Sequence, residues 1–173
     1  MRIEEEIKLD YSDVLFRPKR STLKSRKEVD LCRTYKFKHS NREWTGIPII
    51  AANMDGVGEL NVASSLAKYK IITALTKQHN LDLINNFSPI KDIFNYIALS
   101  SGTGKESFER LKQIISEHTY IQFICIDVAN GYSENFSHFV SSVREKYPSK
   151  TIIAGNVVTA DMTQELILSG ADV

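Results

Sequence analysis

Five short apolar segments rich in β-branched residues recur along the chain, and their first residues lie about 25 to 30 positions apart. They are Ile47–Ala52, Ile71–Leu75, Tyr96–Leu99, Gln122–Val128 and Thr151–Ala154. Each segment is continuously apolar, without the alternation of a half-exposed strand, which is typical of strands covered on both faces. This spacing favours a parallel sheet whose strands are joined by helices.

The intervals between the apolar segments carry helical patterns. Residues 108–115 and 136–147 each place their apolar side chains on one helical face, residues 160–168 form a third predicted helix, and residues 58–69 form a weaker one. Pro148 ends the second of these helices, and Thr159 can cap the N-terminus of the third. The order is therefore a strand followed by a helix, repeated five times.

Two architectures fit this order. A doubly wound sheet would be complete in five strands and suits 173 residues. A (β/α)₈ TIM barrel needs about 250 residues, so this chain would supply only about its first five βα units. Residues 1–46 are polar, carry no βα pattern and are predicted to form an N-terminal extension over the barrel. Residues 47–173 would then hold barrel units one to five, with 171–173 beginning the sixth strand.

Composition narrows the possible partners and setting. The net charge is +1, so no overall field recruits nucleic acid or a membrane surface. No run of 18 apolar residues is present, and the acidic start of the chain lacks the apolar centre of a secretory signal. Cys32 and Cys125 form no Cys-x-x-Cys pair, and Cys125 lies in an apolar run where a buried thiol is expected. A reducing, cytoplasmic setting follows as an expectation.

Polar and glycine residues follow all five predicted strands, at the ends where ligands bind in either architecture. Lys77 comes directly after the second strand, either as a rim lysine lying over apolar surface or as a charge aimed at an anionic ligand. Asp127 ends the fourth strand, either to accept hydrogen bonds from a ligand or to cap the following turn. The five loops together indicate a ligand site on one rim.

Other patterns carry less information. Residues 102–105 do not form a phosphate-binding P-loop, because Glu106 occupies the position of the required Ser or Thr. The basic run 17–27 fits a solvated surface, a phosphate site or, least well, a nucleic-acid contact. Among the histidines, His79 is noteworthy for its closeness to Lys77, whereas His39, His118 and His138 are expected at the surface. No metal-ligand spacing is present in the chain.

Four stretches match a known family closely. They are residues 7–31, IPIIAANMDGVG, FICIDVANGYSENF and TIIAGNVVTADMTQELILSGADV. With these motifs the whole chain resembles the IMP dehydrogenase/GMP reductase family, and most closely its GMP reductase branch. IMP dehydrogenases usually insert a regulatory domain between strands two and three, and the interval from Lys77 to Tyr96 has no room for one.

The resemblance implies a (β/α)₈ barrel and displaces the doubly wound alternative. It also implies NADPH-dependent reductive deamination of GMP to IMP and ammonia in purine interconversion, with GMP and IMP as ligands. A cysteine thiolate would attack C2 of the guanine ring and form a thioimidate. This cysteine and a potassium site are expected after Val173, so the 173-residue chain is expected to be inactive alone. A homotetramer is the assembly that the resemblance implies.

Cofactor roles carry over by position. The resemblance places Ser25 and Arg26 at the adenosine end of NADPH, with Arg26 pairing with the 2′-phosphate. Lys77 should lie beside the nicotinamide and the departing ammonia, where it is also the candidate catalytic group. The residues expected to line the rest of the cofactor site are Asp127, Val128 and Ala129.

On the substrate side, the resemblance places Met54 near the purine base and Asn156 near the nucleotide rim. The chain departs from the family pattern in two loops. Gly56 stands where a threonine is usual, and residues 76–79 read Thr-Lys-Gln-His where the family has His-Lys-His-Tyr. Two other readings stay open: an IMP dehydrogenase-like NAD oxidoreductase without the regulatory domain, and a truncated, non-catalytic nucleotide-binding module.

Overall fold

The computed structural model describes residues 5–7, 9–79, 81–87 and 93–173. The chain divides into two units, Met1–Asp30 and Leu31–Val173, each of which is described by itself. The first unit contains two 3-10 turns, η1 (Tyr11–Asp13) and η2 (Arg26–Glu28).

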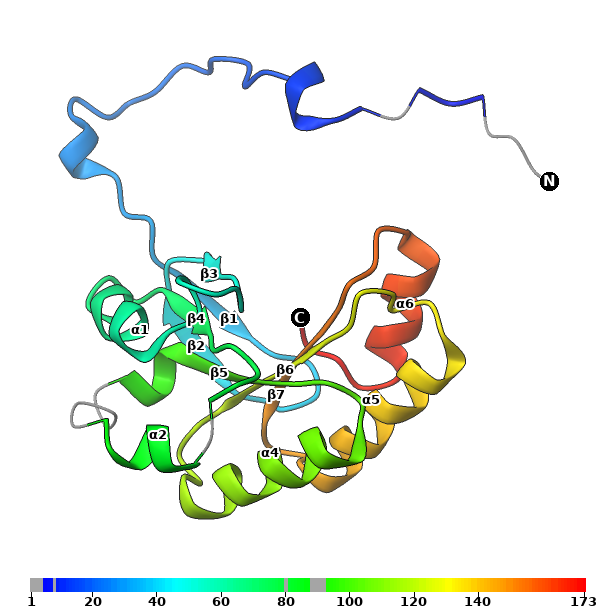
Figure 1. The fold of residues 1–173 in the computed structure, drawn as a ribbon. Helices are drawn as coiled ribbons and strands as arrows, with labels where there is room; N and C mark the ends of the chain where they lie inside the picture. Colours follow the sequence, from blue (N-terminus) through cyan, green and yellow to red (C-terminus); the bar gives the residue numbers. More distant parts are fainter. Residues whose placement is uncertain (1–4, 8, 80, 88–92) are drawn as a thin grey trace. The chain divides into compact units, whose positions relative to one another are not determined.

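The second unit is built on a parallel five-stranded sheet whose strands neighbour one another in chain order (Figure 1). Its strands are β3 (Ile50–Ala51), β4 (Ile72–Ala74), β5 (Ile97–Ser101), β6 (Phe123–Asp127) and β7 (Thr151–Gly155). Each strand falls on one of the five apolar segments, so the predicted strands are confirmed. A strand order without reversal is that of a barrel wall, whereas a doubly wound sheet reverses its order at a switch point.

Helices cover the outer face of this sheet (Figure 1). They are α1 (Leu60–Ala67), α2 (Leu81–Asn85), α4 (Lys105–Glu117), α5 (Glu134–Lys146) and α6 (Ala160–Leu168), with a 3-10 turn η3 (Phe94–Tyr96) before β5. Alternate strand residues such as Leu99, Ile124 and Ile152 are buried against helical residues such as Leu111 and Val140. Fully burying side chains of this size stabilises the fold by about 1.5–3 kcal/mol each. No helix in the described part of the chain is long and apolar enough to cross a membrane.

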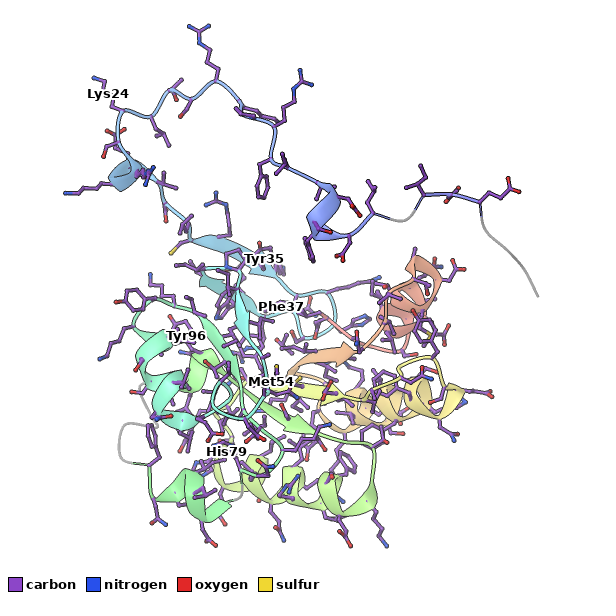
Figure 2. All side chains as sticks on the ribbon, turned by 45° about the horizontal axis from the view of Figure 1, so that its top comes forward. Lys24, Tyr35, Phe37, Met54, His79 and Tyr96 are labelled. Carbon is purple, nitrogen blue, oxygen red and sulfur yellow. The ribbon has the colours of Figure 1, made fainter. Side chains whose placement is uncertain are left out.

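A β-hairpin lies within the segment predicted to be an extension. Its antiparallel strands are β1 (Arg33–Lys36) and β2 (Glu43–Gly46). The rings of Phe37 and Trp44 meet the ring of Phe123 edge-on, with centroids 5.8 and 6.4 Å away. Because Phe123 is the first residue of β6, the hairpin covers the N-terminal ends of the strands. Figure 2 labels Tyr35 and Phe37 on this hairpin.

An ion pair between Arg144 and Asp172 joins the hairpin to the sheet. Arg144 Nη2 lies 2.6 Å from Asp172 Oδ2, and the side chains are 14% and 0% exposed. Asp172 Oδ1 accepts from the backbone N–H of His39 at 2.8 Å, and Oδ2 accepts from that of Ile152 at 3.1 Å. Arg144 also donates to backbone carbonyl oxygens, which are those of Gly170, Tyr147, Pro148 and Lys150.

Residues 171–173, which are predicted to begin a sixth strand, lie beside β7 and are not themselves a strand of the sheet. Val173 N donates to Ile152 O at 3.1 Å, and Ala154 N donates to Val173 O at 3.0 Å, which is the bonding pattern of a parallel pair. Gly170 precedes this segment with a φ of +109°, in the left-handed region that glycine tolerates best. It ends α6, because Gly170 N bonds to Ile167 O at 3.1 Å.

One expectation about the histidines is wrong. His118 is buried, with Nε2 2.7 Å from Asn85 Oδ1 and Nδ1 2.9 Å from the hydroxyl of Tyr120. His138 is exposed on α5, as expected. One of these partners, Tyr120, is close to His118 in sequence and the other, Asn85, is 33 positions away, so both ring nitrogens are bonded inside the fold and the polar local sequence did not indicate exposure.

We expect Asp172→Ala to lower the free energy of unfolding by about 3–5 kcal/mol, because it leaves the Arg144 guanidinium buried without its carboxylate. Urea unfolding followed by circular dichroism measures this change. Glu109→Gln is the matched control, since Glu109 forms an exposed pair with Lys112 on α4. Equal stabilities of Asp172→Ala and the control would show that the buried pair does not hold the hairpin to the sheet.

Candidate functional site

Three side chains from three strand ends meet above the sheet. Lys77 follows β4, Asp127 ends β6 and Asn53 follows β3. Lys77 Nζ lies 3.1 Å from Asp127 Oδ2 and donates to the backbone oxygen of Asp127 at 2.7 Å. Asn53 Nδ2 donates to the same Oδ2 at 3.2 Å. The predicted convergence of the strand ends is therefore confirmed for Lys77 and Asp127, and Asn53 is an additional member.

The two charged side chains of this cluster are each 40% exposed. A surface pair of this kind adds little stability, because water screens it and both side chains lose rotamer freedom. An ammonium group has three N–H donors, and Asp127 engages two of them, so one can reach a ligand. The cluster therefore contributes little to the stability of the fold and places a half-exposed ammonium group at the strand ends.

The loops after β6 and β7 are joined by backbone hydrogen bonds. Val128 N donates to Gly155 O at 2.9 Å, Asn156 N to Val128 O at 3.1 Å, and Gly131 N to Asn156 O at 3.0 Å. A Cβ at Gly131 would lie only 2.8 Å from Asn156 O, so this close approach requires glycine. The structure thus brings together Val128, predicted for the cofactor, and Asn156, predicted for the nucleotide. Ala129, which directly follows Val128, is exposed.

Tyr132 is a residue at this rim that the sequence analysis missed. Its hydroxyl oxygen accepts from Val158 N at 2.8 Å and from Thr159 N at 3.0 Å. Hydrogen bonds from Thr159 and Val158 favour the ionised phenol and hold the pKa of Tyr132 below its usual value. Thr159 precedes α6 as predicted, but its side chain forms no capping bond. Tyr132, from the neighbouring loop, instead binds the backbone N–H groups of Thr159 and of the residue before it, and so holds the segment that leads into α6.

The loop after β3 carries Met54 and Gly56. Met54 is exposed, and Figure 2 labels it close to the strand ends. Gly56 has a φ of +76°, a conformation that β-branched residues rarely adopt. The loop of this chain is therefore built for glycine at the position where the resemblance expects threonine.

Thr76 and His79 flank Lys77 in the loop after β4, and both are buried. Thr76 Oγ1 lies 2.9 Å from His79 Nδ1, and His79 Nε2 lies 3.4 Å from Glu59 Oε2. Both residues depart from the pattern that the resemblance expects. The structure joins these two departures in one contact directly beside the candidate catalytic lysine.

Cys125 lies on the inner face of β6, buried among Ala98, Phe123 and other apolar residues. Burial raises the pKa of its thiol to about 11. The thiolate is the nucleophilic form of cysteine, so Cys125 is inert at neutral pH. The expectation that Cys125 is a buried thiol is confirmed.

Ser25 and Arg26 lie in the first unit, Met1–Asp30, and are described only within it. Ser25 Oγ accepts from Lys27 N at 3.3 Å and so caps η2. Arg26 is exposed and forms no ion pair with any residue that the structure describes.

The strand order and the outer helices define part of a (β/α)₈ barrel, with a polar cluster at the C-terminal strand ends. The family model for the IMP dehydrogenase / GMP reductase domain matches residues 8–173. The chain belongs to the IMP dehydrogenase/GMP reductase family, a family of oxidoreductases.

Individual relatives agree with this assignment. The chain is 53% identical to a GMP reductase of Citrobacter koseri and 54% identical to one of Escherichia coli O81, with 100% of the chain and 50% of each relative covered. A crystal structure of inosine 5′-monophosphate dehydrogenase from Legionella pneumophila superposes with a TM-score of 0.74 at 26% identity, over 93% of this chain and 48% of that one. The chain spans about half the length of the relatives it matches.

Tyr132→Phe removes the oxygen that accepts from the backbone N–H groups of Val158 and Thr159. We expect these two amides to exchange hydrogen several-fold faster, because they lose their acceptor while the ring stays in place. Hydrogen exchange followed by NMR measures the rates. Tyr69→Phe, at an exposed tyrosine after α1, is the control. Unchanged exchange at both amides would show that Tyr132 does not hold the segment before α6.

Proposed function

We propose that the chain is part of an enzyme that converts GMP to IMP and ammonia at the expense of NADPH. The relatives named GMP reductase support this reaction over that of IMP dehydrogenase. The structural observation that carries the proposal is the Lys77 ammonium, held at the strand ends by Asp127 with one donor left for a ligand. GMP and IMP are the proposed ligands of the rim formed by Met54 and Asn156.

In the proposed reaction, NADPH supplies a hydride when bound. Arg26 suits its 2′-phosphate, because an exposed guanidinium without an ion pair among the described residues can pair with phosphate oxygens in bidentate fashion. The Ser25 hydroxyl accepts from Lys27 N and still has its own hydrogen to donate. Asp127, Val128 and Ala129 are proposed to line the nicotinamide side of the pocket.

Lys77 is the proposed catalytic residue of this chain. Its Nζ carries protons that can pass to the departing amine nitrogen of GMP, and Asp127 holds it in a fixed direction. The proposed nucleophile is a cysteine outside these 173 residues, as the resemblance implies, and the raised pKa of Cys125 keeps that thiol neutral. A potassium site outside this sequence and a homotetrameric assembly belong to the same proposal.

We expect the complete protein to oxidise NADPH when GMP is added, and Lys77→Met to lower kcat by at least about 100-fold, as for loss of a general acid. Absorbance of the reduced nicotinamide at 340 nm measures turnover. Lys105→Met, on the first turn of α4, is the control. Reduction of NAD with IMP, but no reaction with GMP, would favour the dehydrogenase reading. The isolated 173-residue chain is expected to show no turnover.

Arg26→Ala should raise the KM for NADPH by about tenfold or more, because loss of one charge-assisted contact costs about 1.5–3 kcal/mol. The KM for GMP should change little, since the proposed partner of Arg26 is the cofactor phosphate. Arg20→Ala is the matched control from the same basic run. An unchanged KM for NADPH in Arg26→Ala would refute this assignment.

A further inference from the structure

Lys77 sits at the tip of a tight turn. His79 N donates to Thr76 O at 3.3 Å, a bond between the first and fourth residues of a β-turn. Lys77 and Gln78 therefore occupy the two central positions. The direction in which the Lys77 side chain leaves the backbone depends on how firmly the two ends of this turn are held.

Side chains close the same turn. Thr76 Oγ1 lies 2.9 Å from His79 Nδ1, and Thr76 O lies 3.2 Å from the same nitrogen. Thr76 and His79 are only 4% and 8% exposed, so little water is available to replace these bonds. Leaving a buried polar group without its partner costs free energy, which favours the bonded state. The contacts among Thr76, His79 and Glu59 are called the clamp below.

The outer edge of the imidazole faces a carboxylate. His79 Nε2 lies 3.4 Å from Glu59 Oε2, and Glu59 precedes α1, where its backbone oxygen accepts from Ala63 N at 2.8 Å. Thr76 N in turn donates to Gly58 O at 2.9 Å. The turn that carries Lys77 is thus fastened to the start of α1 through both its backbone and His79, which Figure 2 labels.

The Thr76 hydroxyl allows the clamp to form with more than one arrangement of hydrogens on the His79 ring. Glu59 and the Thr76 carbonyl can only accept, so they are both satisfied by an imidazole that donates from both nitrogens. An imidazole protonated at Nε2 alone needs a donor at Nδ1, and the Thr76 hydroxyl can rotate to provide it. The Thr76 hydroxyl can therefore act as donor or as acceptor at His79 Nδ1.

We propose that His79, with Thr76 and Glu59, is a positioning residue for Lys77. By fixing the ends of the turn, it holds the Lys77 backbone so that Nζ meets Asp127, fifty positions along the chain. A lysine stem is flexible and carries about 2 kcal/mol of rotamer entropy, so its reach depends on where its Cα is fixed. The catalytic consequence rests on the function proposed above, whereas the geometric consequence does not.

Two matched comparisons in the complete protein test this role. Thr76→Val removes the hydroxyl at nearly constant shape, and Thr76→Ser restores it. His79→Leu removes the imidazole, and His138→Leu is its control, because His138 forms an exposed pair with Glu134 at 3.6 Å on α5. Circular dichroism checks that each variant is folded.

The first measurement is the rate at which acetic anhydride modifies the Lys77 amine, followed by peptide mass spectrometry and normalised to Lys105. We expect Thr76→Val and His79→Leu to raise this rate several-fold, because a loosened Lys77 leaves Asp127 more often. Thr76→Ser should return towards the wild-type rate, and His138→Leu should equal it. Glu59→Gln changes the half-exposed end of the clamp and should give a smaller increase. This variant is expected to fold, so it tests the role even if His79→Leu does not fold.

The second measurement is turnover of GMP with NADPH. Misplacing a reacting group by about 1 Å can cost about 100-fold in rate, so kcat should fall by about tenfold or more while the KM for GMP changes less. Unaltered Lys77 reactivity in Thr76→Val and Glu59→Gln would overturn the positioning role. If the variants show raised Lys77 reactivity but the wild-type protein does not turn over GMP, the positioning role is upheld and the proposed reaction is refuted.

Discussion

The buried ion pair between Arg144 and Asp172 is the interaction on which the second unit depends most. Desolvating two charges is expensive, and this is offset only where every remaining donor and acceptor is paired. Backbone partners surround both charges: Asp172 accepts from the hairpin turn and from β7, and Arg144 donates to the turn after α6 and to the residue before β7. The pair thereby connects α5 to the hairpin, which lies about a hundred positions earlier in the chain.

The two ends of the sheet are consequently built differently. At the N-terminal ends of the strands, the aromatic rings of Phe37, Trp44 and Phe123 pack together near the buried Arg144–Asp172 pair. At the C-terminal ends, Lys77 and Asp127 stay half-exposed, and their pairing contributes little to stability. Stability is concentrated at one end and ligand-accessible charge at the other, which is the usual division in a (β/α)₈ barrel.

Most of the parallel sheet was predictable, because continuous apolar segments buried on both faces leave a strong sequence signal. The hairpin was not, since β1 and β2 are four residues each, mostly exposed, and owe their pairing to Phe37 and Trp44 contacts with Phe123 some 80 positions later. A segment stabilised by distant packing carries little local pattern.

The same distinction applies to the site. Lys77 and Asp127 were predictable because each directly follows or ends an apolar strand. Asn53 and Tyr132 were not, because their roles come from partners in other loops: Asp127 for Asn53, and Val158 and Thr159 for Tyr132. Asparagine and tyrosine are also ordinary loop residues, so their type alone does not indicate a partner.

The departures from the family pattern can now be separated by mechanism. The Gly56 departure is explained by backbone conformation alone, since a β-branched residue would be strained at its positive φ. Thr76 and His79 are coupled, because they contact each other at the two ends of one turn and share the Glu59 connection to α1. A change at one of them alters what the other must satisfy, so their effects on Lys77 should not add independently. The loop therefore behaves as one structural unit, with its lysine at the centre and its own set of partners on either side.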